Sequence, residues 1–344
     1  MTRRTAQFWM LALIPALGAC SEANRGPVFS MAGTSIVWPS PPDTPRIRYV
    51  GEIRGEKSLG IGRSGWKKFS EALTGPAPTL EFSTPMSVAV SGGTIFVADP
   101  QNACVFKVGL EPRSITPITL ADGKPMQWPL DVDASPSGLA VADSQRGAVF
   151  LFDLNGNFQR SIGAGQLKRP SAVAWDGQHN RWWVLDTAAH ACVIFDAGGS
   201  RVASIGGKGV AAGQFNFPAG MTYRAGLGAV VADSMNFRVQ LMGADGKAPV
   251  VFGRKGDAAG DFSMPRDVAT DSDGNIYVLD NQFENVQIFN RQQQLLMALG
   301  RGGAGPGQFN LPAGITIDDR DRIWIADTYN RRVQVFQYLK EAPQ

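Results

Sequence analysis

The sequence predicts an all-β fold, a six-bladed β-propeller, and three features that recur in register predict it. A three-residue motif, two apolar residues followed by Asp, occurs six times and ends at Asp99, Asp143, Asp186, Asp233, Asp280 and Asp327. A Pro lies 14 to 16 residues before each of them, at Pro85, Pro129, Pro170, Pro218, Pro265 and Pro312. Three residues before each Pro stands a large apolar side chain, at Phe82, Met126, Leu167, Phe215, Phe262 and Phe309. The Asp residues are 44, 43, 47, 47 and 47 residues apart, the period of a propeller blade.

Each repeat, within residues 80–337, reads as a set of short strands. In the last one, "GITID" follows the Pro, the turn "DRDR" comes next, and "IWIAD" and "RVQVF" complete it. Short runs rich in Val and Ile, separated by Asp, Asn and Gly, are strand and hairpin signals. Four such strands per repeat predict one antiparallel blade.

The amino-acid sequence of the repeats resembles that of the NHL repeat family. The segments "GQFNFPAGMTY…VVADSMNFRVQLM" and "GQFNLPAGITIDDRDRIWIADTYNRRVQVF" carry the resemblance, which is strong in units four to six and weaker in units one to three. It covers residues 80–337 and implies a propeller of six blades.

The propeller is expected to span residues 46–338 and to be closed by its N-terminus. The last repeat ends at its third strand, and the segment "RIRYVGEIRG" (residues 46–55) has the alternation of the missing fourth strand. Closure would remove the exposed edges of an open sheet. Trp66, Phe69 and Leu73 recur at helical spacing, which predicts one amphipathic helix over residues 64–74, docked on the propeller. Residues 339–344 form a tail.

Residues 1–19 are expected to be a lipoprotein signal peptide. Arg3 and Arg4 precede an apolar stretch that is too short for a transmembrane helix, and "LGAC" ends it. This resembles the lipobox of bacterial lipoproteins, which implies lipidation of Cys20; the alternative is an ordinary secretory signal cut near Ala19. Residues 20–45 would then hold the lipidated Cys and a Pro-rich tether. Ser21 favours, by the same resemblance, the outer membrane of the bacterial cell envelope.

The net charge argues against nucleic acid as a partner, and the positions of the two remaining cysteines argue against a disulfide. Removal of the signal lowers the formal charge from +3 to +1, which gives no electrostatic case for nucleic acid. Cys104 and Cys192 both precede a Val, at the place that Arg238 holds in blade four, so we expect equivalent positions on blades one and three. That separation predicts two free thiols rather than a disulfide.

The six repeated Asp residues are expected to be structural. A residue present in every blade is explained by what every blade needs, and an Asp at the end of a strand can accept N–H groups of the loop that follows. Arg238 and Arg332 lie five residues after their Asp and could pair with it.

Function should then lie where the blades differ. The loop after the second strand and the loop entering the first strand open on one face of a propeller. The candidate binding face on these loops is made of Trp128, Arg146, His190, Met235, Phe237, Phe283 and Tyr329. Exposed apolar residues that cluster mark contact surfaces; the alternative is that these side chains pack on neighbouring blades.

The residues favour a binding module over an enzyme. The chain has only two His, and His190 and His179 should lie on opposite faces, so they cannot share a metal. We expect a monomeric, non-catalytic envelope lipoprotein without a cofactor, which binds another envelope protein or a glycan and meets the membrane only through its lipid. The alternative is a lyase-like or lactonase-like enzyme, or a sensor, with a small-molecule or Ca²⁺ site in the central channel. The segment "DSDG" (residues 271–274) could supply Ca²⁺ ligands but reads more simply as a hairpin turn.

Overall fold

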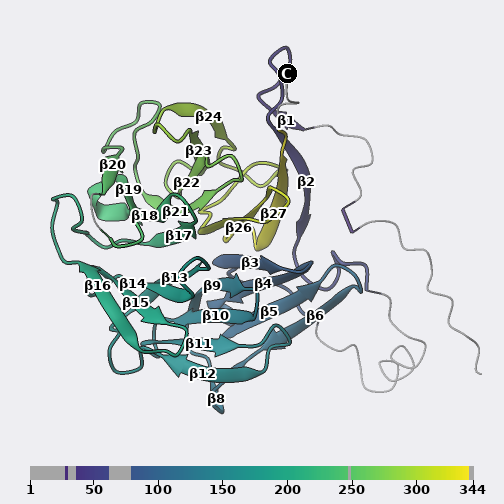
Figure 1. Cartoon of the computed structure of the whole chain (residues 1–344). Helices are drawn as coiled ribbons and strands as arrows, with labels where there is room; N and C mark the ends of the chain where they lie inside the picture. The colour runs from purple at the N-terminus through teal and green to yellow at the C-terminus, as the bar shows by residue number, and fades with distance from the viewer. Residues whose placement is uncertain (1–27, 30–35, 62–78, 247–248, 341–344) are drawn as a thin grey trace, which may run out of the picture.

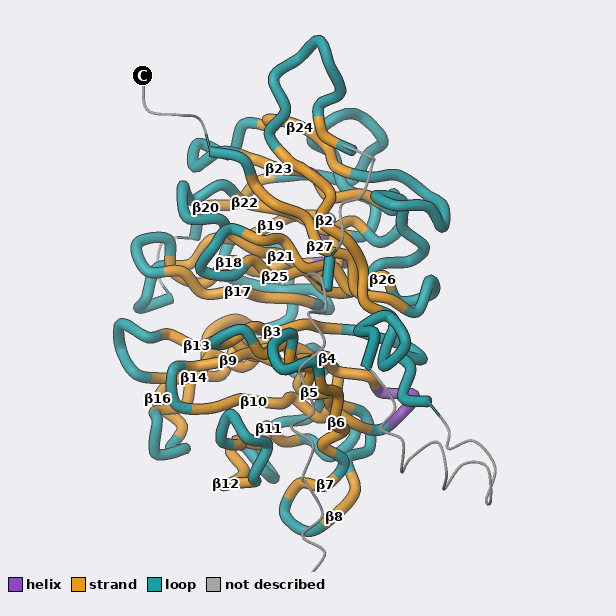
Figure 2. Tube along the Cα trace, turned by 90° about the vertical axis from the view of Figure 1, so that its right-hand side faces the viewer, coloured by secondary structure: helices purple, strands orange, loops and turns teal. Residues whose placement is uncertain are grey.

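The computed structural model describes residues 28–29, 36–61, 79–246 and 249–340. Six antiparallel sheets are arranged in a ring, with their first strands innermost and their fourth strands at the periphery (Figure 1). The prediction of an all-β six-bladed propeller is therefore confirmed. Figure 2 shows the same sheets turned by 90°.

The blades follow one another along the chain. Blades one and two contain β3 (Ser87–Ser91), β4 (Thr94–Asp99), β5 (Cys104–Gly109), β6 (Ser114–Ile118), then β9 (Pro129–Ser135), β10 (Gly138–Asp143), β11 (Ala148–Phe152) and β12 (Phe158–Ile162). Blades three and four contain β13 (Pro170–Asp176), β14 (Arg181–Asp186), β15 (Ala191–Asp196), β16 (Arg201–Gly206), then β17 (Gly220–Arg224), β18 (Gly228–Asp233), β19 (Arg238–Met242) and β20 (Val250–Phe252). Blade five contains β21 (Pro265–Thr270), β22 (Ile276–Asp280), β23 (Asn285–Phe289) and β24 (Leu295–Leu299). The short hairpin β7 (Leu120–Ala121) and β8 (Lys124–Pro125) joins blades one and two, and the single 3₁₀ turns η1 (Pro100–Asn102) and η2 (Ser234–Asn236) follow β4 and β18.

Blade six is closed by the N-terminal segment. It contains β25 (Gly314–Ile317), β26 (Arg322–Asp327) and β27 (Arg332–Tyr338), and β2 (Ile47–Ile53) pairs antiparallel with β27 as the fourth strand. A fifth strand, β1 (Val37–Trp38), pairs with β2, and Trp38 packs on Phe336. The part of the expected tether from residue 36 onward is thus built into the propeller.

Each hydrophobic core lies between two blades rather than inside one. Six clusters of buried side chains each combine residues of two adjacent blades, and the sixth joins blade six to blade one. The large apolar residue that precedes each Pro contributes one member to each cluster: Phe82, Met126, Leu167, Phe215, Phe262 and Phe309. This anchor recurs because each interface between blades has to be filled.

The two cysteines are free and buried, as expected, but they are not equivalent. Cys104 lies opposite Asp99, the place of Arg238 in blade four, whereas Cys192 lies opposite Leu185, one residue further along its strand. The sequence alignment on the following Val was therefore wrong by one position in blade three. Burial raises the pKa of Cys104 to about 12 and raises that of Cys192 as well, so neither thiol is activated.

The other N-terminal expectations lie outside the described residues. These are the signal peptide, Cys20 and the helix over residues 64–74. In the part of the chain that the structure describes, no helix is long and apolar enough to cross a membrane.

Candidate functional site

The loops entering the first strands and the loops between second and third strands meet on one side of the propeller, which we call the upper face. Backbone hydrogen bonds join the two sets directly: Ser144 N donates to Trp128 O, Met235 N to Asn216 O and Tyr329 N to Asn310 O, at 3.0 to 3.2 Å. The turns between first and second strands and between third and fourth strands lie on the opposite side, the lower face.

The repeated Asp residues join these two sets of loops. All six are at most 1% exposed. In blade two, Asp143 accepts the N–H groups of Gln127 and Trp128 from the entering loop and those of Gln145 and Arg146 from the following loop, at 2.8 to 3.2 Å. Asp99, Asp186 and Asp280 accept backbone N–H groups from both loops in the same way. The sequence suggested the bonds to the following loop but not those to the loop 15 to 18 residues earlier.

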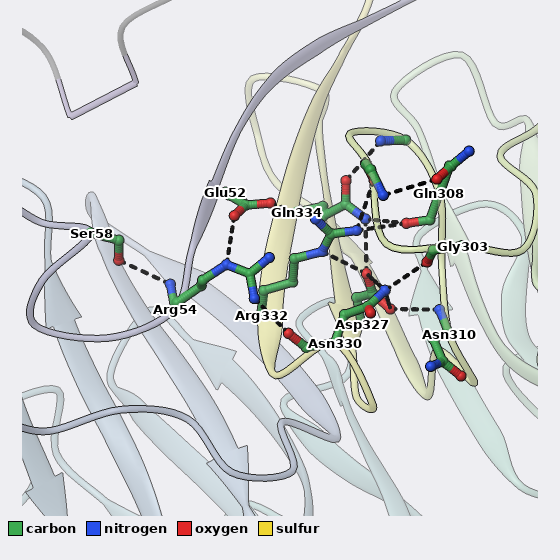
Figure 3. Close-up of polar contacts among 12 residues, drawn as sticks. Glu52, Arg54, Ser58, Gly303, Gln308, Asn310, Asp327, Asn330, Arg332 and Gln334 are labelled. Carbon is green, nitrogen blue, oxygen red and sulfur yellow. Dashed lines mark hydrogen bonds and ion pairs between the residues drawn. The ribbon is translucent and has the colours of Figure 1, made fainter.

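Blades four and six use a larger polar cluster, because an Arg lies opposite the repeated Asp, where blade five has Asn285. Figure 3 shows Asp327, Arg332 and Gln334 directed at the loop that contains Gly303 and Gln308. Asp327 Oδ2 accepts Arg332 Nε at 2.7 Å and Gln334 Nε2 at 3.0 Å. Arg332 also donates to Gly305 O and Gln308 O, and Gln334 Oε1 accepts Gly307 N.

Blade four repeats this arrangement with Asp233, Arg238 and Gln240. The repeated "RVQ" is thus explained by bonds that hold the entering loop on the upper face.

The candidate binding residues all lie on the upper face but differ in exposure. Tyr329, Met235 and Trp128 are 66%, 47% and 37% exposed. Phe237 and Phe283 are half-buried, and Lys255 Nζ lies 5.1 Å from the centre of the Phe237 ring.

Arg146 and His190 are occupied inside the protein. Arg146 is half-buried over the Phe150 ring, and its Nη1 donates to Ala121 O at 2.8 Å. His190 is 9% exposed; its Nδ1 accepts Phe217 N at 3.0 Å, and its ring packs on Phe217. These contacts hold the upper-face loops in place.

Sequence reasoning missed a set of residues around the mouth of the channel. They stand immediately before the repeated Pro of each blade: Thr84, Trp128, Arg169, Phe217, Met264 and Leu311. Phe217 and Met264 are 46% and 40% exposed, and Val210 on the entering loop of blade four is 76% exposed. Only Trp128 was selected from the sequence. Comparing this one position across the six repeats would have found the others.

The channel below the mouth is narrow and acidic. Asp131 and Asp133 of blade two accept the N–H groups of Val173 and Trp175 in blade three, both at 2.7 Å, and Asp267 of blade five accepts Ile315 N in blade six at 2.8 Å. The innermost strands of adjacent blades belong to separate sheets and form no backbone hydrogen-bond ladder with each other. These carboxylates therefore accept hydrogen bonds from backbone N–H groups at the strand edges that would otherwise have no partner.

Burial governs the ionisation of these channel groups. It raises the pKa of Asp131 to about 6 and that of Asp133 to about 7, and it raises the pKa of Asp267 well above its usual value. Arg266, beside Asp267, has its pKa lowered by burial.

The two histidines lie on opposite faces. His179 is in the turn between β13 and β14 on the lower face, where Nδ1 contacts Asp176 Oδ2 at 2.9 Å. Among the described residues, no three His, Cys, Asp or Glu side chains gather as a set of metal ligands.

Two parts of the chain match a known repeat family. Residues 262–289 and 309–336 match the NHL repeat, and they contain three strands each of blades five and six. The chain therefore contains NHL repeats. No curated protein matches it.

Several solved structures share the fold. A streptogramin B lyase has 12% identity and a TM-score of 0.57, over 75% of this chain and 94% of that chain. A structural genomics protein of unknown function from Bacteroides thetaiotaomicron has 15% identity and a TM-score of 0.61, over 75% and 70%. An auxiliary nutrient binding protein from the same organism has 11% identity and a TM-score of 0.60, also over 75% and 70%. At these identities the likeness concerns the fold alone.

Proposed function

Starting from a six-bladed β-propeller that carries NHL repeats, we propose that the chain is a non-catalytic binding module whose upper face docks a protein partner. The observation that supports this most is the exposed apolar side chains on the upper face: Trp128, Val210, Phe217, Met235, Met264 and Tyr329. Apolar side chains gathered on one face of a protein mark contact surfaces, and aromatic residues and Met are enriched in interfaces.

The charge on the same face indicates the chemistry of the partner. The entering loops of blades three to six carry six exposed basic residues and one exposed acidic residue, Asp257. The basic residues are Lys168, Arg169, Lys208, Arg254, Lys255 and Arg301. Complementary charge steers association, so the partner should present an acidic, partly apolar surface.

The channel supports a docking role over chemistry inside the propeller. The cavity among the first strands has a volume of about 30 Å³, between residues such as Asp131, Asp267 and Ile315. Small-molecule sites have volumes of about 300–1,000 Å³. The alternative of an enzyme or sensor in the channel is therefore less well supported, and our proposal includes no resident cofactor.

A capture experiment with matched variants tests the docking face. Phe217→Ser, Met235→Ser and Tyr329→Ser would be combined and compared with Val202→Ser, Val250→Ser and Leu296→Ser, which are equally exposed on fourth strands. We expect the first variant to lose partners captured from detergent-solubilised membranes, and the second to retain them. Equal capture by both would refute the upper face as the docking surface.

We propose further that the module acts as a monomer, anchored in the outer membrane through a lipid on Cys20. The support is the resemblance of "LGAC" to a lipobox. Cys20→Ser should abolish labelling by radioactive palmitate and release the protein into the soluble fraction. Persistent labelling of the Ser variant would contradict this assignment.

A further inference from the structure

A second pocket lies on the lower face, between blades two and three. It has a volume of about 470 Å³ and is bounded by the turns that contain Ser135, Ser137 and Asn180, and by Asp153 and Ala197. Its volume falls in the range of small-molecule sites, about 300–1,000 Å³. This Trp cleft, as we call it after Trp175 and Trp182 in its wall, is separate from the docking surface proposed above.

Two tryptophans belong to the apolar wall of the cleft, together with Leu139, Leu151 and Phe152. Trp175 and Trp182 face each other across β13 and β14, with ring centres 4.7 Å apart and planes inclined by 53°. The corresponding cross-strand pairs in the other five blades contain at most one aromatic residue: Val90–Ile95, Ala134–Leu139, Tyr223–Ala229, Thr270–Ile276 and Ile317–Ile323. The fold does not require a Trp pair at this place.

The indole N–H groups of this pair lack partners. Trp182 is only 4% exposed, yet its Nε1 forms no hydrogen bond to any residue that the structure describes, and neither does Trp175 Nε1. The buried Trp183 and Trp324, in contrast, donate to Asp176 and Asp318. Among the described side chains, only Asn285 Oδ1 is sealed from solvent without a partner. Trp182 Nε1 is therefore not sealed from solvent, and Trp182 lines the cleft.

The rim of the cleft is polar, and its two charged residues, Asp153 and Arg160, already form hydrogen bonds within the protein. Asp153 accepts the N–H groups of Asn155 and Asn157 and the side-chain amide of Asn157. Arg160 donates to Ala197 O and Gly198 O across the outer end. The neutral groups that line the cleft are the two indoles, Asn180, and the side chains of Ser137 and Gln159, which have one hydrogen bond each.

We propose that the Trp cleft binds a neutral sugar unit of a glycan. A sugar has apolar C–H faces that can pack on indole rings and hydroxyl groups that can accept the two free indole N–H groups. A fully apolar ligand would leave these donors unpaired at a cost. A charged ligand would have to compete with the hydrogen bonds that Asp153 and Arg160 already make to Asn155, Asn157 and backbone carbonyl groups.

Calorimetric titration with three neutral tetrasaccharides, tetra-N-acetylchitotetraose, cellotetraose and maltotetraose, tests the proposal. At least one should bind with a Kd of about 1 mM or tighter, and Trp175→Ala should weaken it about tenfold or more. The matched control is Tyr223→Ala, which removes a half-buried aromatic at the same position of blade four. Its affinity should equal that of the parent.

Trp182→Phe gives an independent readout if Trp175→Ala fails to fold. It keeps an aromatic ring in the core but removes the unpaired N–H, so it should retain the melting temperature and weaken sugar binding. No binding of any of the three sugars, or equal binding by the parent and the Trp variants, would overturn the proposal. Loss of partner capture by the upper-face variant would leave this result unchanged, so the two proposals fail separately.

Discussion

At the scale of single residues, Asp has two distinct structural uses in this propeller. The repeated Asp of each blade is buried with several N–H donors and joins two loops on the upper face. Asp131, Asp133 and Asp267 lie in the channel, each with one donor from the next blade. Of the first use, the bonds to the following loop could be predicted from the repeat, but not those to the entering loop. The second could not, because it depends on which neighbouring strand leaves an N–H unpaired.

Removing a repeated Asp should destabilise the whole propeller. Asp327→Ala leaves Arg332, which is 1% exposed, without one of its two carboxylate partners, the other being Glu52. Breaking a buried charge pair typically costs about 3–5 kcal/mol, so the free energy of unfolding in urea should fall by about that much. The control Asp257→Ala, on an exposed loop, should change it by less than about 0.5 kcal/mol. Similar losses in both variants would contradict this role of Asp327.

The channel carboxylates should make stability depend on pH. An unfolded Asp has a pKa of about 3.9, whereas that of Asp133 is raised to about 7 by burial. The folded state then binds more protons between these values, so the free energy of unfolding falls as the pH rises from about 4 to about 7.

Asp133→Asn can still accept the N–H of Trp175 but carries no charge. It should melt above the parent at pH 8 and close to it at pH 4, as measured by circular dichroism. A difference that is the same at both values would exclude Asp133 as the titrating group.

At the scale of elements, the sequence predicted the closing strand but not its neighbour. The alternation in residues 46–55 identified β2, observed at Ile47–Ile53. The two-residue strand β1 has no periodicity to detect and is flanked by Pro39, Pro41 and Pro42. The sequence identified the long entering loops of blades four to six only as Gly-rich segments. Their conformation is held by hydrogen bonds to Arg and Gln side chains of other strands.

Deleting Arg46–Ile53 should open blade six. The deletion exposes the edge of β27, which β2 covers, and removes Ile47 and Ile53, which are at most 1% exposed. An unpaired edge strand promotes aggregation. We expect a large fall in melting temperature together with increased light scattering. A matched deletion of residues 36–45 removes β1 but keeps β2, and it should cause a smaller fall. If the two deletions behave alike, β2 does not close the ring.

At the scale of the whole molecule, the repeat period determined the fold but not the function. The repeated features occur six times in register, which predicts six blades, and the large apolar residue before each Pro is part of a core between two blades. The candidate face was predicted by position. However, the exposure of Met235 and the burial of His190 depend on how each loop packs, and the repeat pattern of the sequence does not predict this packing. The Trp cleft lies between two blades, so it could not be seen within any single repeat.

Because every core is shared, the propeller should unfold as one unit. In an open repeat array each unit contacts only its neighbours, so the ends can unfold first. Here the cluster with Trp324 and Phe82 joins the last blade to the first, so the ring has no end. Phe262→Ala, in the interface between blades four and five, should therefore lower a single melting transition rather than create a second one. Calorimetry should give equal calorimetric and van't Hoff enthalpies for the parent and the variant. Two resolved transitions would show that groups of blades unfold independently, and that closure by β2 does not couple the ring.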